Sequence, residues 1–215
     1  MALVQPSVQP RPLEGEQVSG AAQDQLACKR ARGLTLTQLE HVFLVHRLPA
    51  WHTNRIKQIT KAPKLLLCDS ALLAYLLRAG PRRLIEDESL LGILLECFVG
   101  MELVKQISAK APQARLLHMR TATGAEVDFV IEATDGRLVG VEVKASETVR
   151  GQHFKHLASM RDRVADERFV RGVVLYPGGE RLSFGERLEA WPLASLWTDP
   201  EAGRGATQSS HDLDP

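Results

Sequence analysis

The residues with the clearest potential for chemistry are an aspartate in one predicted strand and a glutamate and a lysine in the next. Glu142 and Lys144 stand two residues apart among valines, so their side chains share one face of a strand. Carboxylates suit Mg²⁺, and a lysine beside the ion can position the attacking water and neutralise charge on a phosphate. The pattern predicts a catalytic set of Asp128, Glu142 and Lys144, with Asp128, Glu142 and Glu96 as metal ligands.

The turn between the two strands decides whether Asp128 can meet Glu142. A two-residue turn at 135–136 sets Asp128 opposite Val143, away from the other two side chains. A three-residue loop, or a bulge that shifts the register by one, brings Asp128 to Glu142 and Val127 opposite Val143 on a common buried face. The apolar residues favour the shifted register. An ordinary half-exposed hairpin with solvated charges is the alternative.

Apolar periodicity predicts the elements that must position these residues. We expect Val127, Phe129 and Ile131 to share one face of their strand, and Asp69 to cap a helix. Helices are predicted over 71–78, 83–108 and 153–164, and strands over 65–68, 115–119, 126–132, 137–145, 169–176 and, at an edge, 188–191, with a final helical turn over 193–197. A helix running into an edge strand is expected over 39–48. The order helix, three antiparallel strands, helix, strand indicates an α/β fold.

Composition describes an ordinary globular protein without a strong electrostatic pull toward nucleic acid. Lysine and arginine total 27 against 26 acidic residues, which gives a net charge of +1. The three cysteines are far apart and odd in number, which fits a reducing cytoplasm and neither a zinc site nor a disulfide framework. No apolar run is long enough for a membrane helix, so we expect a cytoplasmic protein without a membrane partner.

A basic segment near the start of the ordered region could contact DNA. Arg55, Lys57, Lys61 and Lys64 lie close together in the sequence, with Trp51 nearby, and could follow a phosphate backbone. A charged edge that discourages strand pairing is the alternative interpretation. The histidines include no helical metal-binding pair, and His153 and His156 are expected to face solvent.

The pieces around the proposed site carry a family resemblance. The strings at 123–132 and 135–146 resemble the signature of the domain-of-unknown-function family DUF4143. Further matching pieces lie at 48–51, 54–55, 61–64, 69–70, 95–99, 102–103, 172–176 and 193–197. The resemblance implies the C-terminal part of a prokaryotic ATP-binding protein of the AAA class, with a fold similar to PD-(D/E)XK nucleases. Glu96, Asp128, Glu142 and Lys144 fall on the positions expected for such a site.

This resemblance implies a restriction-endonuclease-like mixed sheet flanked by helices and preceded by a winged-helix remnant. The expected divisions are a disordered segment at 1–33, the winged-helix remnant at 34–69, the nuclease-like domain at 70–198 and a disordered tail at 199–215. The implied activity is Mg²⁺-dependent DNA phosphodiester cleavage. The alternatives are a non-catalytic regulatory or partner-binding domain and a truncated gene product.

One departure from the family pattern is large. No G-x-x-x-x-G-K-[ST] motif occurs anywhere in the sequence, so we expect no ATP site and no ATPase activity from this chain. An ATPase supplied by a separate chain stays open as a partner. A gene fragment, a mis-started reading frame and a stand-alone domain all stay open as origins of the sequence.

Overall fold

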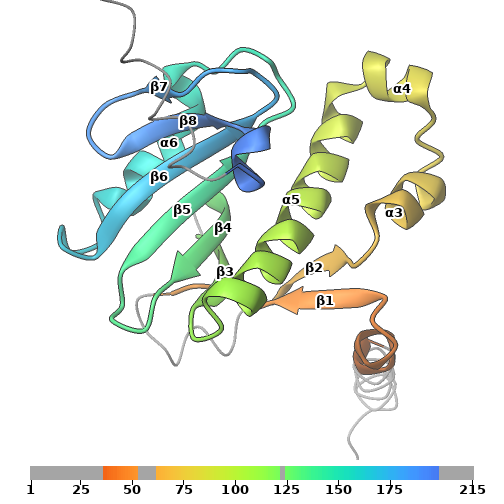
Figure 1. Ribbon diagram of the computed structural model, residues 1–215, viewed down its shortest axis with the longest axis horizontal. Helices are drawn as coiled ribbons and strands as arrows, with labels where there is room; N and C mark the ends of the chain where they lie inside the picture. The colour runs from red at the N-terminus through yellow and green to blue at the C-terminus, as the bar shows by residue number, and fades with distance from the viewer. Residues whose placement is uncertain (1–35, 53–61, 122–123, 199–215) are drawn as a thin grey trace, which may run out of the picture.

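The computed structural model describes residues 36–52, 62–121 and 124–198. These residues form a mixed α/β fold around a six-stranded sheet in the order β3-β4-β5-β6-β8-β7 (Figure 1). The predicted α/β class is therefore confirmed. The ends predicted to be disordered, 1–33 and 199–215, lie outside the described residues, as does most of the basic segment.

The main sheet combines an antiparallel meander with a parallel extension. Its strands are β3 (Arg115–Arg120), β4 (Glu126–Glu132), β5 (Leu138–Val143), β6 (Phe169–Tyr176), β7 (Leu182–Ser183) and β8 (Leu188–Pro192). β3, β4 and β5 pair antiparallel, whereas β6 runs parallel to β5 and β8 runs parallel to β6. The predicted edge position of the last strand is wrong, because the two-residue β7 pairs with the outer side of β8.

A small second sheet precedes the long helix. β1 (Val45–Leu48) pairs antiparallel with β2 (Lys64–Leu67) and follows a short helix over 36–41. Ala50 then bridges His118 in parallel fashion, which ties this segment to the β3 edge of the main sheet. The winged-helix origin expected for 34–69 stays a prediction.

The further helices are α3 (Ser70–Leu76), α4 (Pro81–Glu86), α5 (Glu88–Lys110) and α6 (Lys155–Arg161), with 3₁₀ turns η1 (Gly151–Phe154) and η2 (Leu193–Leu196). The two helices α5 and α6 cover opposite faces of the main sheet (Figure 1). Asp69 caps α3 as predicted, because its side chain accepts hydrogen bonds from the backbone of Ala71 and Leu72.

The predicted single helix over 83–108 is wrong at its start. The chain leaves helical geometry at Asp87, which has φ −122° and ψ 90° and separates α4 from α5. The Asp87 carboxylate accepts a hydrogen bond of 3.0 Å from the Leu90 N–H, which satisfies one of the unpaired donors at the start of α5. The apolar residues continue with helical spacing across Asp87, but Asp87 acts as the N-cap of α5 and interrupts the helix.

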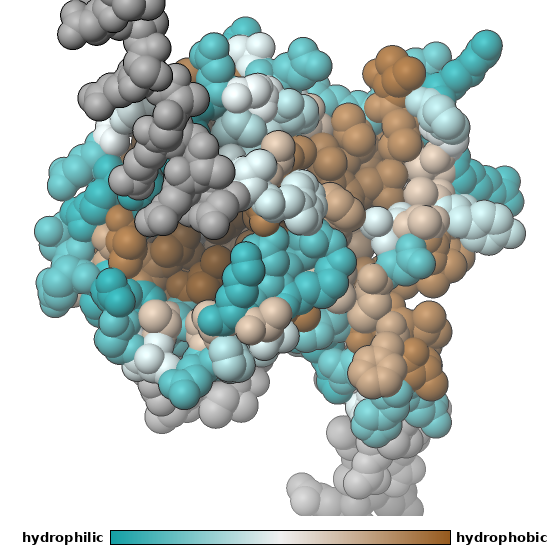
Figure 2. Space-filling view, in the orientation of Figure 1, coloured by the Kyte–Doolittle hydropathy of each residue, from teal (hydrophilic) through white to brown (hydrophobic). Residues whose placement is uncertain are grey.

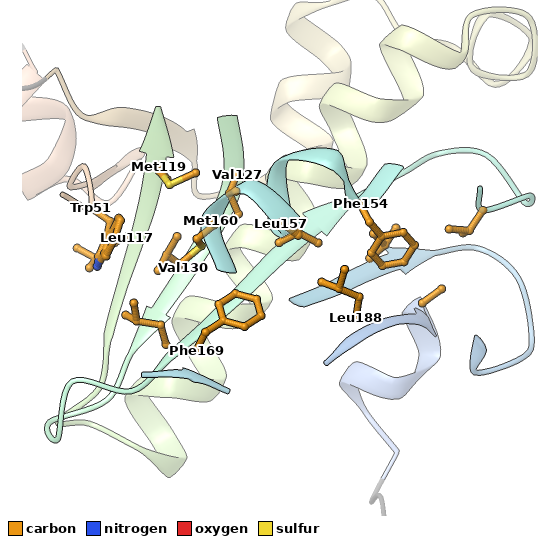
Figure 3. Packing of buried hydrophobic residues seen from close by; sticks show 14 of the residues in the cluster. Trp51, Leu117, Met119, Val127, Val130, Phe154, Leu157, Met160, Phe169 and Leu188 are labelled. Atoms are coloured by element: carbon orange, nitrogen blue, oxygen red, sulfur yellow. The ribbon is translucent and has the colours of Figure 1, made fainter. Parts of the chain in front are cut away.

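Helices cover the main sheet on both faces, and each face has its own apolar core. The α6 face is shown in Figure 3 and contains Trp51, Leu117, Met119, Val127, Val130, Leu138, Val149, Phe154, Leu157, Met160, Phe169, Val174, Tyr176, Leu188 and Ala190. The α5 face contains Leu48, Leu66, Val99, Leu103, Phe129, Val141, Val143, Val173 and Leu175. Leu48 and Leu66 of the small sheet contribute to the α5-side core, and Trp51, which follows β1, contributes to the α6-side core.

Two glycines allow the helices to approach the sheet closely. A Cβ atom on Gly140 of β5 would lie 2.7 Å from the Leu157 side chain of α6. A Cβ atom on Gly100 of α5 would lie 2.8 Å from the Phe129 ring in β4. Both separations are shorter than van der Waals contact, so only glycine fits without a shift of its neighbours.

A bulge in β4 changes which residues share a face. Leu117 pairs with Val130 and Met119 pairs with Val127, so Asp128 and Phe129 together lie opposite one residue of β3. Val127 therefore packs in the α6-side core, while Phe129 packs in the α5-side core. The prediction that Val127, Phe129 and Ile131 share a face is wrong for this reason.

Within the part of the chain that the structure describes, no helix combines the length and apolarity needed to cross a membrane.

Candidate functional site

The centre of the site is Glu142 on β5. Its side chain is 5% exposed, and its Oε2 accepts a hydrogen bond of 2.9 Å from the Lys144 ammonium. Its Oε1 is buried and has no hydrogen-bond partner among the described residues; the Nδ1 of His156 stands 3.7 Å away. A buried carboxylate oxygen without a donor is costly, so this atom is poised to accept a proton or a cation.

The hairpin between β4 and β5 has the shifted register that brings Asp128 toward Glu142. The Ala133 N–H donates to the Arg137 carbonyl, which closes a three-residue loop with Gly136 at φ +84°. Phe129 consequently pairs with Val141, as the shifted register requires. The predicted condition on the turn is confirmed.

Asp128 reaches the site through the bulge and is held there by the neighbouring strand. Its Oδ2 accepts a hydrogen bond of 2.9 Å from the Val143 N–H, beyond the last paired residues of the ladder. The expectation that Val127 and Val143 share a buried face is wrong, because they pack in the α6-side and α5-side cores respectively. The bulge separates the two valines and frees Asp128 from the regular alternation.

Lys64 at the start of β2 lies among carboxylates. Its ammonium stands 2.5 Å from Glu96 Oε1, 3.5 Å from Asp128 Oδ1 and 3.9 Å from Glu126 Oε1. The side chain is 16% exposed, and the ammonium also lies 5.4 Å from the centre of the Phe129 ring. Lys64 is one of the basic residues that could follow a phosphate backbone; in the structure its ammonium faces acidic side chains, and the DNA contact stays a prediction.

The charges of this acidic cluster, defined as Glu96, Glu126, Asp128 and Glu142, perturb one another. Burial first, and then the charge of Asp128, raise the pKa of Glu142 to about 7, against the opposing effect of Lys144 and Lys64. Burial and the Asp128 charge also raise the pKa of Glu96. For Lys64, burial lowers the pKa, but the carboxylates outweigh burial and the net shift is upward. The lysine therefore stays charged, while Glu96 and Glu142 resist ionisation.

The described residues do not present a preformed metal site. No three histidine, cysteine or acidic side chains among them are grouped so that they could hold a metal ion. Glu96 meets Lys64 rather than Glu142, and Lys144 covers one oxygen of Glu142. The predicted residues are thus brought into one neighbourhood, in an arrangement neutralised by two lysines.

A pocket of about 360 Å³ adjoins Lys64 on the side of β3. It is lined by Ala62, Pro63, Lys64, His118, Arg120, Thr121 and Glu126. Burial lowers the pKa of His118, and the nearby Lys64 charge lowers it further, so the imidazole is neutral at pH 7.

Sequence reasoning missed the contacts of two residues at this site. Lys64 begins an apolar strand directly after Pro63, a signal that its side chain is partly enclosed. His156 was expected to face solvent, yet its ring approaches Glu142, with a side chain 38% exposed. The remaining proposed DNA contacts, Arg55, Lys57 and Lys61, lie outside the described residues.

Comparison with known proteins supports the family resemblance over the part of the chain that contains the site. Residues 91–196 match the family model described as Domain of unknown function (DUF4143), and residues 29–83 match Domain of unknown function (DUF8612). The first match contains Glu96, Asp128, Glu142 and Lys144, and the second contains Lys64.

Two mycobacterial relatives extend the likeness across both matches. Uncharacterized protein Rv2008c of Mycobacterium tuberculosis and Uncharacterized protein Mb2031c of Mycobacterium bovis are each 29% identical over 163 residues. The match covers 76% of this chain and 35% of each relative, so the chain spans about a third of the relatives' length.

One solved structure shows a weaker likeness. It is the refined half-complex from a tetradecameric assembly of Thermococcus gammatolerans McrB AAA+ hexamers with bound McrC. The identity is 14%, the match covers 52% of this chain and 30% of that chain, and the TM-score is 0.36. A score this low carries no argument about this chain.

Proposed function

We propose that this chain carries a PD-(D/E)XK-like, Mg²⁺-dependent phosphodiesterase domain that acts on DNA and belongs with an ATPase of the AAA class. The observation that carries the proposal is the convergence of Asp128 and Glu142 from neighbouring strands beside Lys144. The order α5, β3, β4, β5, α6, β6 supports a restriction-endonuclease-like sheet, since β6 joins the antiparallel meander in parallel. The resemblance to DUF4143 and the greater length of the relatives support the link to an ATPase.

The donor chemistry of the site fits a magnesium ion. Mg²⁺ prefers carboxylate oxygens and keeps several of its waters, so two protein carboxylates are enough to hold it. The buried Oε1 of Glu142 has no hydrogen-bond partner in the described structure, and Asp128 presents a second carboxylate beside it. Asp128 and Glu142 would hold the ion, and Glu96 would complete the carboxylates around it once released from Lys64.

The roles of the side chains follow from what each one contacts. A bound magnesium ion would supply Lewis acidity at the phosphate and lower the pKa of a water at the site. Lys144 lies on the same face of the chain as Glu142, where its ammonium can orient the attacking water and offset the charge that develops on the phosphate. The Val143 N–H fixes the Asp128 carboxylate, and His156 limits the positions open to the Glu142 carboxylate.

The test combines calorimetric titration of Mg²⁺ and Mn²⁺ with a plasmid-nicking assay on the same protein. Asp128→Ala is expected to lose ion binding and nicking, whereas Lys144→Ala is expected to lose nicking and keep ion binding. Lys155→Ala is the matched control, because Lys155 is an exposed lysine at the start of α6. Well-folded protein that neither binds an ion nor nicks DNA would refute the proposal.

An exposed apolar surface favours a second candidate function, a non-catalytic docking domain for an ATPase in a separate chain. Figure 2 shows hydrophobic residues gathered over α3, α4 and α5. The side chains of Tyr75, Ile85 and Ile93 are 80%, 86% and 52% exposed. Apolar surface gathered in this way marks sites of protein association. The match also covers only 35% of the length of each relative. A separate chain equivalent to the remaining part of a relative could cover this surface.

The docking function is tested with the part of the Mycobacterium tuberculosis relative that this chain does not cover. Calorimetry should detect binding of that purified part to this protein, and Ile85→Glu should abolish it because the substitution places a charge on the apolar surface. Arg82→Glu on the same helix is the control, since it changes an exposed residue that is already charged. Binding that survives Ile85→Glu, or no binding at all, would exclude docking through this surface.

A further inference from the structure

We propose that Lys64 is a tethered cation that keeps the acidic cluster closed, and that a divalent ion enters the site by displacing the Lys64 ammonium. The inference rests on the proposed function, because it concerns the same carboxylates. It assigns to Lys64 a role different from a DNA contact: the lysine sets how tightly the site binds an ion.

The position of the ammonium is the first support. Lys64 Nζ lies within 4 Å of three carboxylates, those of Glu96, Asp128 and Glu126. Two of these carboxylates, Glu96 and Asp128, are the ones proposed to surround the ion. These oxygens would attract a metal ion to the place that the Lys64 ammonium now occupies. The two cations would exclude each other, because like charges at such distances repel strongly in a partly buried site.

The balance of charge is the second support. The acidic cluster holds four carboxylates, and the two ammonium groups of Lys64 and Lys144 face them. The Arg120 guanidinium lies 3.9 Å from Glu126, and its side chain is 70% exposed. The carboxylates of the acidic cluster therefore outnumber the ammonium groups that face them. A divalent cation would balance the cluster better than one ammonium does.

The unpartnered oxygen of Glu142 is an independent sign of a missing ligand. Glu142 is 97% buried, and its Oε1 makes no hydrogen bond to any described residue. Among the described residues, the ion pairs of Lys64 are with Asp128, Glu96 and Glu126 and not with Glu142. The tethered ammonium thus neutralises one part of the cluster, while Glu142 Oε1 accepts no hydrogen bond and has the His156 Nδ1 3.7 Å away.

The pocket beside Lys64 gives the ammonium a place to go. Lys64 lines this pocket of about 360 Å³, and Glu126 forms part of the same wall. A turn of the lysine side chain into the pocket would carry the ammonium away from Glu96 and Asp128 while Glu126 remains within reach. Displacement would therefore cost less than the loss of all three ion pairs, because one carboxylate partner is kept.

The test is calorimetric titration of Mn²⁺ alone into the full chain and into Lys64→Met, without DNA. Methionine keeps the apolar stem of the lysine and removes its charge, so ion affinity should rise by about tenfold or more when the competing ammonium is gone. Lys105→Met is the matched control, because Lys105 pairs with Glu102 on the surface of α5, and its ion affinity should equal that of the unaltered protein. Equal affinities for the unaltered protein and Lys64→Met would overturn the tethered-cation role and leave the proposed ion site intact.

Two further outcomes separate the inference from the function on which it rests. If Mn²⁺ binds neither the unaltered protein nor Lys64→Met, the ion site itself is refuted and the inference falls with it. If Lys64→Met does not fold, NMR of the ¹⁵N-labelled lysine ammonium groups in the unaltered protein decides the matter during a Mg²⁺ titration. The Lys64 signal should lose its protection from exchange as the ion binds, and a signal that stays unchanged while the ion binds would overturn the inference.

Discussion

Replacement of Glu142 by glutamine should stabilise the protein at alkaline pH and leave it nearly unchanged in mild acid. The pKa of Glu142 is raised from 4.5 to about 7, first by burial and then by the charge of Asp128. The folded protein therefore binds the proton more tightly than the unfolded chain does. Ionisation of Glu142 opposes folding above pH 7, and this cost disappears as the pH falls through 7 toward 4.5.

The size of the effect follows from the shift. A change from 4.5 to about 7 corresponds to about 3 kcal/mol of folding free energy at pH 8. Glutamine keeps the shape of the side chain and carries no charge, so the variant escapes this cost. The free energy of unfolding of Glu142→Gln, relative to that of the unaltered protein, should rise by about 3 kcal/mol between pH 4.5 and pH 8.

The assay is urea unfolding of both proteins at a series of pH values. Glu147→Gln is the matched control, because Glu147 is an exposed glutamate that follows Lys144 closely in the sequence. A difference between Glu142→Gln and the unaltered protein that is constant from pH 4.5 to pH 8 would refute the reasoning. It would mean that the carboxylate is solvated or fully compensated in solution.

Three further predictions concern packing, capping and a buried histidine. Gly100→Ala should lower the free energy of unfolding by about 1–3 kcal/mol in urea titrations, because the new Cβ would press on the Phe129 ring, whereas Gly92→Ala on the same helix has open space and should be neutral or slightly stabilising. Asp87→Ala should cost about 1 kcal/mol through loss of the α5 cap, and Asp87→Asn should keep most of it. His118 has a pKa lowered by burial, so stability should fall as the pH drops below about 6.5, and His118→Leu should remove that dependence in thermal unfolding.

Local patterns predicted the meander and its neighbouring strand accurately. The boundaries of β4 and β6 agree with the predicted ranges 126–132 and 169–176, because period-two alternation and a continuous apolar run are properties of a few adjacent residues. The shifted register of β4 and β5 was also foreseeable from their apolar residues, although the sequence left open whether a three-residue loop or a bulge would produce it; the structure has the loop.

What the sequence concealed depends on distant parts of the chain or on competing local signals. The bulge at Asp128 arises from the pairing of β4 with β3, and no residue type within β4 predicts it. The ion pairs of Lys64 join segments far apart in the sequence, so its placement among carboxylates could not be read from the basic segment alone. At Asp87, a helical apolar period and a capping residue gave opposite indications, and only the structure shows that the cap prevails.

The small sheet and Trp51, which follows β1, belong to the shortest part of this protein that can fold by itself. Trp51 is buried in the α6-side core, Leu48 and Leu66 are buried in the α5-side core, and Lys64 neutralises Glu96 and Asp128. A polypeptide that started at residue 70 would lose part of both cores and would leave Glu96 and Asp128 without the positive charge of Lys64. Truncation experiments and evolutionary rearrangements that preserve the fold must therefore carry β1 and β2 together with the main sheet.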